Sequence, residues 1–244
     1  MTGTRLYKTK CDLCGTEGLS MYSPDAKYTI YCHDCWWGDK WNPKDYGQEY
    51  DFSRPFFEQF EELFHKSPLR AQPIDDITRK LSPYTNHAGW CKNCYLIFFS
   101  EGCEDTAYGF FLKGTKRTYD SSMTWKCENV FDVTNGVKSY NIFTGQGNIV
   151  NCVDCYFIKD CKNCNNCFGS INLRNKSYVF FNEQLTKEEY KKRINEIDLG
   201  SYKTYENTRK KVYEFWKSKI PRPVYDDFST NVTGSYIRES KNCR

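Results

Sequence analysis

Four cysteines near the start of the chain have the spacing of a closed metal site. Cys11 and Cys14 form one Cys-x-x-Cys pair, Cys32 and Cys35 form a second, and seventeen residues separate the two pairs. Two such pairs supply four thiolates to one tetrahedral zinc ion and leave no coordination position for water. We therefore predict one structural zinc ion here, in preference to two disulfides or four unrelated thiols. A closed site of this kind holds a fold together and does not catalyse.

A second group of cysteines comprises Cys152, Cys155, Cys161 and Cys164, with Cys167 close behind. The spacing also suits metal ligands, so these four residues are a candidate site for a second zinc ion. Small thiols equally fill tight inward corners of a β-repeat with a three-residue rhythm, because cysteine behaves as a small buried hydrophobe. We favour buried structural thiols, with the second zinc ion as the alternative and disulfides as a third interpretation.

The sequence lacks the usual signatures of catalysis. It has no phosphate-binding loop, and residues 145–148 lack the third glycine and the following helix of a dinucleotide site. Only three histidines are present, which leaves little material for general-base chemistry at neutral pH. We therefore predict a protein that is not an enzyme and has no small-molecule substrate. A metal-dependent hydrolase acting around residues 86–105, through His87 and Glu104, is a minor alternative.

The two cysteine pairs require a small zinc ribbon, and a helix is predicted after it. Ser53 and Pro55 give a helix start, and Ser67-Pro68 gives a stop. The phenylalanines between them recur at helical spacing, and we expect this stripe to be buried against tryptophans or the next domain. A solvent-exposed aromatic recognition face is the alternative. Three prolines among polar residues then indicate an extended connector over 68–90.

The middle of the chain repeats weakly, in units that start at residues 91, 116, 137 and 161. Each unit carries short β-type runs and turn residues, with a period near 23. This pattern predicts a β-solenoid, in which stacked coils bury their inward side chains on one another. A meandering antiparallel sheet is the alternative. The fold class is therefore α+β, with a zinc ribbon, a solenoid-like body and C-terminal helices.

Two helices are predicted after the repeats. Thr186 and Glu189 form a capping box for the first, and the second starts near Ser201 and stops before Pro221. We expect these helices to cover the open end of the solenoid. The predicted segments are 1–50 (ribbon), 51–90 (helix and linker), 91–184 (repeat domain), 185–222 (helices) and 223–244 (flexible tail).

The charge of the chain is uneven. The formal net charge is only +4, but residues 187–222 hold eleven basic side chains against six acidic ones. Basic side chains neutralise phosphates, and the tyrosines among them can stack on bases. A solvated helix face is the alternative interpretation. The residues predicted to contact nucleic acid are Lys191, Lys192, Arg193, Arg209, Lys210 and Lys211.

The cysteines and the start of the sequence predict the compartment. Fourteen cysteines occur without an apolar leader segment, and no stretch approaches eighteen apolar residues. Unpaired or metal-bound thiols are typical of a reducing compartment. We expect a cytoplasmic protein with no membrane-spanning segment.

Three motifs resemble a known group of proteins. They are the sequences at 32–41, around the second cysteine pair, at 50–60 and at 172–184. They resemble an uncharacterised family of zinc-ribbon proteins with Cys-rich repeats from uncultivated bacteria and from environmental or viral genomes. Family members are richer in Cys-x-x-Cys through the middle, whereas two units here carry Tyr119 and Tyr140 instead. The resemblance implies the architecture and no particular activity.

Taken together, these observations predict a zinc-stabilised binding or scaffold protein. Nucleic acid or a ribonucleoprotein is the expected partner, contacted by the ribbon and the basic helices, and protein partners are also compatible. The alternative is a structural component of a larger assembly, such as a virion or an envelope-associated complex.

Overall fold

The computed structural model describes residues 4–74, 78–221, 226–227, 229–234 and 237–243. The chain divides into two compact units, Met1–Glu104 and Asp105–Arg244, and the division lies inside the segment 91–184 predicted as one domain. The elements of the first unit are β1 (Tyr7–Lys10), β2 (Glu17–Ser20), the 3-10 helix η1 (Pro24–Ala26), β3 (Ile30–Tyr31), α1 (His33–Trp37), η2 (Pro43–Tyr46), α2 (Phe56–Lys66), β4 (Leu69–Arg70), β5 (Asn86–Gly89) and β6 (Tyr95–Glu101).

The first unit begins with the ribbon. Strands β1 and β2 form an antiparallel hairpin, and β3 pairs in parallel with β4, which follows α2 in sequence. The ribbon's small core consists of Cys11, Tyr31 and Cys35, with partly buried Trp36 and Trp41 packed against it. The core is therefore built largely from the predicted metal ligands and aromatic rings.

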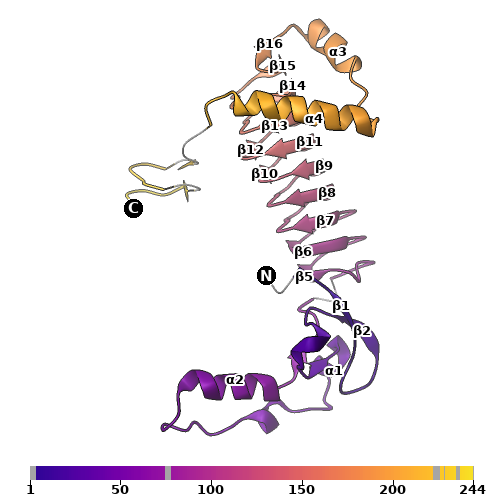
Figure 1. The fold of residues 1–244 in the computed structure, drawn as a ribbon, viewed down its shortest axis with the longest axis vertical. Helices are drawn as coiled ribbons and strands as arrows, with labels where there is room; N and C mark the ends of the chain where they lie inside the picture. Colours follow the sequence, from indigo (N-terminus) through magenta and orange to yellow (C-terminus); the bar gives the residue numbers. More distant parts are fainter. Residues whose placement is uncertain (1–3, 75–77, 222–225, 228, 235–236, 244) are drawn as a thin grey trace. The chain divides into compact units, whose positions relative to one another are not determined.

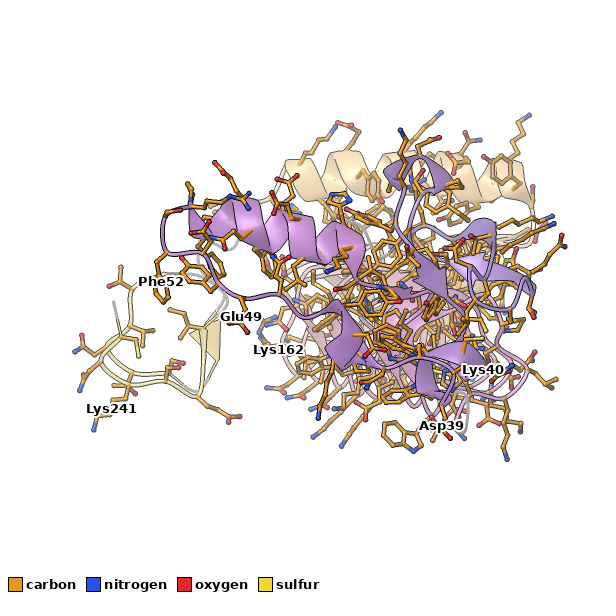
Figure 2. The ribbon with its side chains drawn as sticks, turned by 90° about the horizontal axis from the view of Figure 1, so that it is seen from below. Asp39, Lys40, Glu49, Phe52, Lys162 and Lys241 are labelled. Atoms are coloured by element: carbon orange, nitrogen blue, oxygen red, sulfur yellow. The ribbon has the colours of Figure 1, made fainter. Side chains whose placement is uncertain are left out.

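Helix α2 forms in the predicted segment, but its N-cap is Pro55 and not the predicted Ser53, and its phenylalanine stripe is exposed. Phe56, Phe57 and Phe60 are 54%, 79% and 51% exposed, so the expectation that they are buried in a core is wrong. The buried residue of the helix is Gln59, whose Nε2 donates to the carbonyl of Asp51 at 2.9 Å. A polar anchor thus holds the helix to the preceding loop, where the exposed Phe52 also lies (Figure 2).

The second unit contains most of the repeat body and the C-terminal helices (Figure 1). Its main sheet runs in the order β7-β8-β9-β11-β13-β14-β15-β16, and a second face pairs β10 with β12. Its elements are β7 (Ala107–Phe110), β8 (Lys116–Ser122), β9 (Glu128–Val133), β10 (Gly136–Val137), β11 (Tyr140–Gln146), β12 (Ile149–Val150), β13 (Val153–Lys159), β14 (Asn165–Phe168), β15 (Ser177–Phe180), β16 (Glu183–Gln184), α3 (Lys187–Asn195), α4 (Tyr202–Lys217), β17 (Asp226–Asp227) and β18 (Ile237–Arg238).

The body is a β-solenoid of parallel strands, as predicted, and the antiparallel meander is wrong. One coil is twelve residues long: Ala107 pairs with Tyr119, and Tyr119 pairs with Phe131. The predicted period near 23 therefore corresponds to about two coils. One coil has an extra residue after Gly147, and Asn148 there donates its backbone N–H to Asp160 Oδ1 at 3.0 Å.

Every third residue of the solenoid points inward, which confirms the three-residue rhythm. The inward side chains are small because four of them share the interior of each twelve-residue coil. We call a set of inward residues at the same place in successive coils a column. One column holds Cys127, Ser139, Cys152 and Cys164, and the next holds Thr118, Val130, Ile142, Cys155, Cys167 and Val179, all nearly buried.

The residue before almost every inward position has a left-handed backbone. Asn129, Asn141 and Asn163, for example, have φ values of 55°, 53° and 51°. Asparagine and aspartate tolerate this conformation better than most residues, which explains the abundance of Asn in the repeats. These side chains also bond between coils: Asn163 accepts from Asn151 at 3.1 Å and donates to Asn175 at 2.9 Å.

The C-terminal helices cover a lateral aromatic face as well as the end of the solenoid. Helix α3 begins with the predicted capping box and packs on β15, where Tyr190 contacts Tyr178. Helix α4 lies across the coils around β13 (Figure 1). Its Tyr205 hydroxyl lies 3.1 Å from Thr144 Oγ1 and donates to Asp132 at 3.2 Å. Burial raises the pKa of Asp132.

The segment 223–244, predicted as a flexible tail, contains some described structure. Strands β17 and β18 pair in parallel, and Asn231 donates to Asn242 Oδ1 at 2.8 Å. Both asparagines have a left-handed backbone, as in the solenoid. Residues 223–225, 228, 235–236 and 244 of this tail lie outside the described residues.

Candidate functional site

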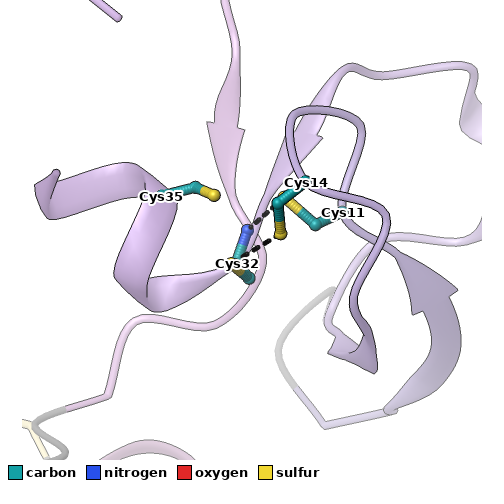
Figure 3. A group of neighbouring side chains, drawn as sticks. All are labelled: Cys11, Cys14, Cys32 and Cys35. Carbon is teal, nitrogen blue, oxygen red and sulfur yellow. Dashed lines mark hydrogen bonds between the residues drawn. The ribbon is translucent and has the colours of Figure 1, made fainter. Parts of the chain in front are cut away.

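The four N-terminal thiols converge on one point. Cys11 and Cys14 lie in the turn that joins β1 to β2, Cys32 is the N-cap of α1, and Cys35 lies within α1 (Figure 3). Their four Sγ atoms all lie within 4.8 Å of one another. The sequence prediction that these residues form one cluster is therefore confirmed, and the cluster could hold a metal ion.

The sulfur geometry fits a tetrahedral ion. Four sulfurs at about 2.3 Å from a metal would be about 3.8 Å apart, and the Cys14 and Cys32 sulfurs are 3.8 Å apart. The backbone N–H of Cys32 donates to Cys11 Sγ at 3.2 Å, a bond that favours a thiolate acceptor. Four thiolates would complete the coordination of such an ion and leave no open position.

The surroundings of the cluster hold the two cysteine pairs together. Asp12, between the first two cysteines, accepts a 2.6 Å hydrogen bond from the backbone N–H of Ile30, just before the second pair. The Thr16 hydroxyl and backbone, next to Cys14, lower the pKa of that thiol to about 6. Burial raises the pKa of Cys35. The cluster therefore contains a thiol that already favours the charged form.

His33, beside the cluster, is occupied elsewhere. Its Nδ1 lies 3.0 Å from the guanidinium of Arg70, so it takes part in a link between α1 and β4. Among the residues that the structure describes, the four thiols are the one group of His, Cys, Asp and Glu side chains with the geometry to hold a metal ion.

The candidate ligands of a second ion lie in the solenoid interior. Cys152, Cys155 and Cys161 are fully buried and Cys164 is 1% exposed. Each thiol donates to a backbone carbonyl two residues before it, at 3.5, 3.2, 3.2 and 3.2 Å respectively. A thiol that donates a hydrogen bond is protonated, which favours the interpretation as structural thiols.

The six predicted basic residues lie on α3 and α4, and two of them make structural contacts. Arg193 pairs with Glu183 at 2.7 Å, and its guanidinium lies over the Phe180 ring. Arg209 pairs with Glu206 at 3.5 Å, and its Nε donates to the Tyr213 hydroxyl at 3.2 Å. The exposed members of the set are Lys191, Lys192, Lys210 and Lys211.

The structure brings together a further basic surface that sequence reasoning missed. Lys113 is in register with Trp125 on one outer face of the solenoid, and Lys126 and Lys138 lie beside them on successive coils. We call these four residues the basic-aromatic strip. All four side chains are exposed, with Trp125 at 42%. A twelve-residue spacing would have aligned Lys113 with Trp125 and Lys126 with Lys138, but the period near 23 concealed it.

The residues named for a minor hydrolase are held in other contacts. His87 stacks on Phe99 with ring centroids 4.3 Å apart, and burial lowers its pKa. Glu104 pairs with Lys92 at 3.1 Å. Both side chains therefore take part in contacts within the first unit.

Comparisons with known proteins give no family or relative from which a function could be inferred. A scan against models of known protein families finds no match, and a search of curated proteins finds no similar sequence. No helix among the described residues is both long and apolar enough to cross a membrane.

Proposed function

We propose that the protein is a zinc-stabilised, non-enzymatic binding protein whose partner is nucleic acid, alone or in a ribonucleoprotein. The observation that carries the proposal is the basic-aromatic strip, Lys113, Trp125, Lys126 and Lys138. Zinc is the ion that two Cys-x-x-Cys pairs with four converging thiolates suit best. The N-terminal thiol cluster then has a structural role, and the nucleic acid binds to the exposed surface of the protein.

The basic-aromatic strip combines the two features that binding of single-stranded nucleic acid requires. Lysine ammonium groups neutralise phosphates, and the face of an exposed indole stacks on a base of any sequence. Because neighbouring coils are about 4.8 Å apart, Lys126 and Lys138 repeat along the solenoid and can follow a backbone. Residues 113–138 hold five basic side chains against three acidic ones, and one of these, Glu128, is paired with Arg117.

The basic helices add a second candidate contact. Lys191, Lys192, Lys210 and Lys211 are exposed on α3 and α4 in the same unit as the strip. Arg193 and Arg209 are less suited to phosphates, because each already has an acidic partner. Binding through the helices alone would be salt-dependent but would not need Trp125.

The test is binding of fluorescent single-stranded RNA and DNA by anisotropy over a range of salt concentrations. We expect wild-type binding, with the slope of log affinity against log salt reduced by about 0.7 for each lysine removed in Lys126→Ala/Lys138→Ala. Trp125→Ala should weaken binding by about 1–3 kcal/mol with little change in slope. Lys217→Ala/Lys219→Ala is the matched control, because it removes the same charge from exposed positions of the same unit. No binding by the wild type at low salt would rule out a nucleic-acid partner.

A second candidate function, assembly with other proteins, is favoured by the exposed stripe of α2. Phe56 stacks on Phe60, and Phe60 stacks on Phe64, so the stripe forms one continuous apolar surface. Exposed apolar patches of this kind mark interaction sites. If the chain assembles through this stripe, light scattering after size exclusion should show an oligomer that Phe57→Asp/Phe60→Asp converts to a monomer. A wild-type monomer at all concentrations would exclude self-assembly.

A further inference from the structure

Several cysteines of the solenoid occupy the same column on neighbouring coils. Cys155 and Cys167 are twelve residues apart and are direct register partners between β13 and β14. Cys152 and Cys164 occupy the adjacent column of the same two coils. In the first unit, Cys91 and Cys103 have the same relation. Six of the nine cysteines between residues 91 and 167 thus fall into three in-register pairs.

The hydrogen bonds between coils fix the register of the two pairs that lie outside strands. Val153, which follows Cys152, donates its N–H to the carbonyl of Cys164 at 2.9 Å. Lys92, which follows Cys91, donates to the carbonyl of Cys103 at 2.9 Å and is the parallel bridge partner of Glu104. The two cysteines of each pair therefore occupy equivalent positions on neighbouring coils.

The spacing of adjacent coils lies within the range of Cα separations that a disulfide joins. Strands in adjacent coils are about 4.8 Å apart, and disulfides join Cα atoms about 4.4–6.8 Å apart. Both side chains of each pair lie in the same interior, since all six residues are at most 1% exposed.

The interior has no competing metal site among the described residues, because only the N-terminal thiols have metal-holding geometry. In the reduced form the interior thiols donate to carbonyls, for example Cys155 to Val153 at 3.2 Å and Cys167 to Asn165 at 3.4 Å. These bonds are weak, since sulfur is a poor donor. Oxidation of a pair therefore removes only weak hydrogen bonds.

We propose that Cys91–Cys103, Cys152–Cys164 and Cys155–Cys167 are three sites of disulfide formation between neighbouring coils of the solenoid. The oxidant is a small disulfide such as glutathione disulfide. The two thiols of a pair lose two protons and two electrons as their S–S bond forms. Glutathione disulfide accepts these two electrons and two protons. Its S–S bond breaks, and two glutathione thiols are released. The reaction proceeds through a mixed disulfide when a coil opens or before it closes.

Oxidation cross-links neighbouring coils covalently. Each disulfide closes a loop of twelve residues that the folded solenoid already brings together, so it restricts the unfolded chain more than the folded one. The two coils that contain residues 152–167, beneath α3 and α4, would carry two such disulfides side by side. This property is independent of the proposed nucleic-acid contact.

The experiment treats the full-length, zinc-loaded protein with glutathione disulfide until the count of alkylatable thiols is constant. Trypsin then separates Cys152 and Cys155 (peptide 139–159) from Cys161 (160–162) and from Cys164 and Cys167 (163–174). We expect peptides 139–159 and 163–174 to be joined, and the oxidised protein to melt at a higher temperature than the reduced one. Zinc content is followed in parallel, so that oxidation of the N-terminal cluster is recognised.

Serine variants identify the pairs. Cys155→Ser and Cys152→Ser should each leave one bond between the two peptides, and the double variant should leave none. Serine is already accepted at inward positions, including Ser139 in the column of Cys152, so these variants should fold. Free thiols in all three interior peptides after oxidation, or a bond from peptide 160–162 to 163–174 in place of the expected one, would overturn the proposal.

Discussion

Cys35→Ser should abolish binding of the single zinc ion and unfold the ribbon, while the solenoid remains folded. The ribbon's core is Cys11, Tyr31 and Cys35 with a few aromatic rings, so we expect its folding to depend on the metal. Zinc binding to zinc-finger peptides contributes about 10–16 kcal/mol, which is more than a core of this size supplies. The solenoid has its own buried columns of side chains and needs no ion.

The measurement is metal content by mass spectrometry on protein purified without added zinc, together with tryptophan fluorescence. We expect one zinc per wild-type chain and none in Cys35→Ser, with a red-shifted signal from Trp36 and Trp41, which pack against the cluster. Cys243→Ser is the control, because it removes an exposed thiol far along the sequence. Two zinc ions per chain would assign Cys152, Cys155, Cys161 and Cys164 as ligands. Retention of zinc by Cys35→Ser would contradict the site.

The ribbon cluster could be predicted because its ligands are local in sequence. Each Cys-x-x-Cys turn brings its own two sulfurs together. Only the contact between the two turns therefore had to be inferred. The helices were predictable for a similar reason: Thr186 with Glu189 and Ser201 mark helix starts that the structure confirms. Such signals are read within a few residues and need no knowledge of tertiary packing.

The repeat length was harder to obtain because the coil tolerates many residue types. Inward positions accept Cys, Thr, Ser, Val, Ile and Gly, so hydrophobicity does not mark them consistently. Outer positions vary more, as in Lys113, Trp125 and Val137 at one place in three coils. The regular feature is the left-handed backbone at every third residue, which Asn and Asp mark only partly. The exposure of the α2 stripe was also unpredictable, since amphipathic spacing does not say whether a partner belongs to the same chain.

Phe157→Ala should destabilise the second unit by about 3–5 kcal/mol. The Phe157 ring is fully buried between the solenoid and α4, with centroids 5.6 Å from both Phe168 and Tyr205. Removing it leaves a cavity beside the Phe168 and Tyr205 rings, and Phe168 is held in place by stacking on Phe180 of the next coil. We also expect loss of the bond from Tyr205 to Asp132, since the cavity lies under the same turn of α4.

Tyr108→Ala is the matched control for this prediction. Tyr108 occupies the same place in its coil as Phe157, with the same left-handed backbone, but it is 55% exposed. The two substitutions therefore have similar backbone consequences and differ in what covers the ring. Urea denaturation followed by circular dichroism, with Trp216 fluorescence as a probe of α4, should show a loss below about 1 kcal/mol for Tyr108→Ala. Equal losses in the two variants would mean that α4 does not pack on this face, and that the aromatic residues are conformational requirements of the coil itself.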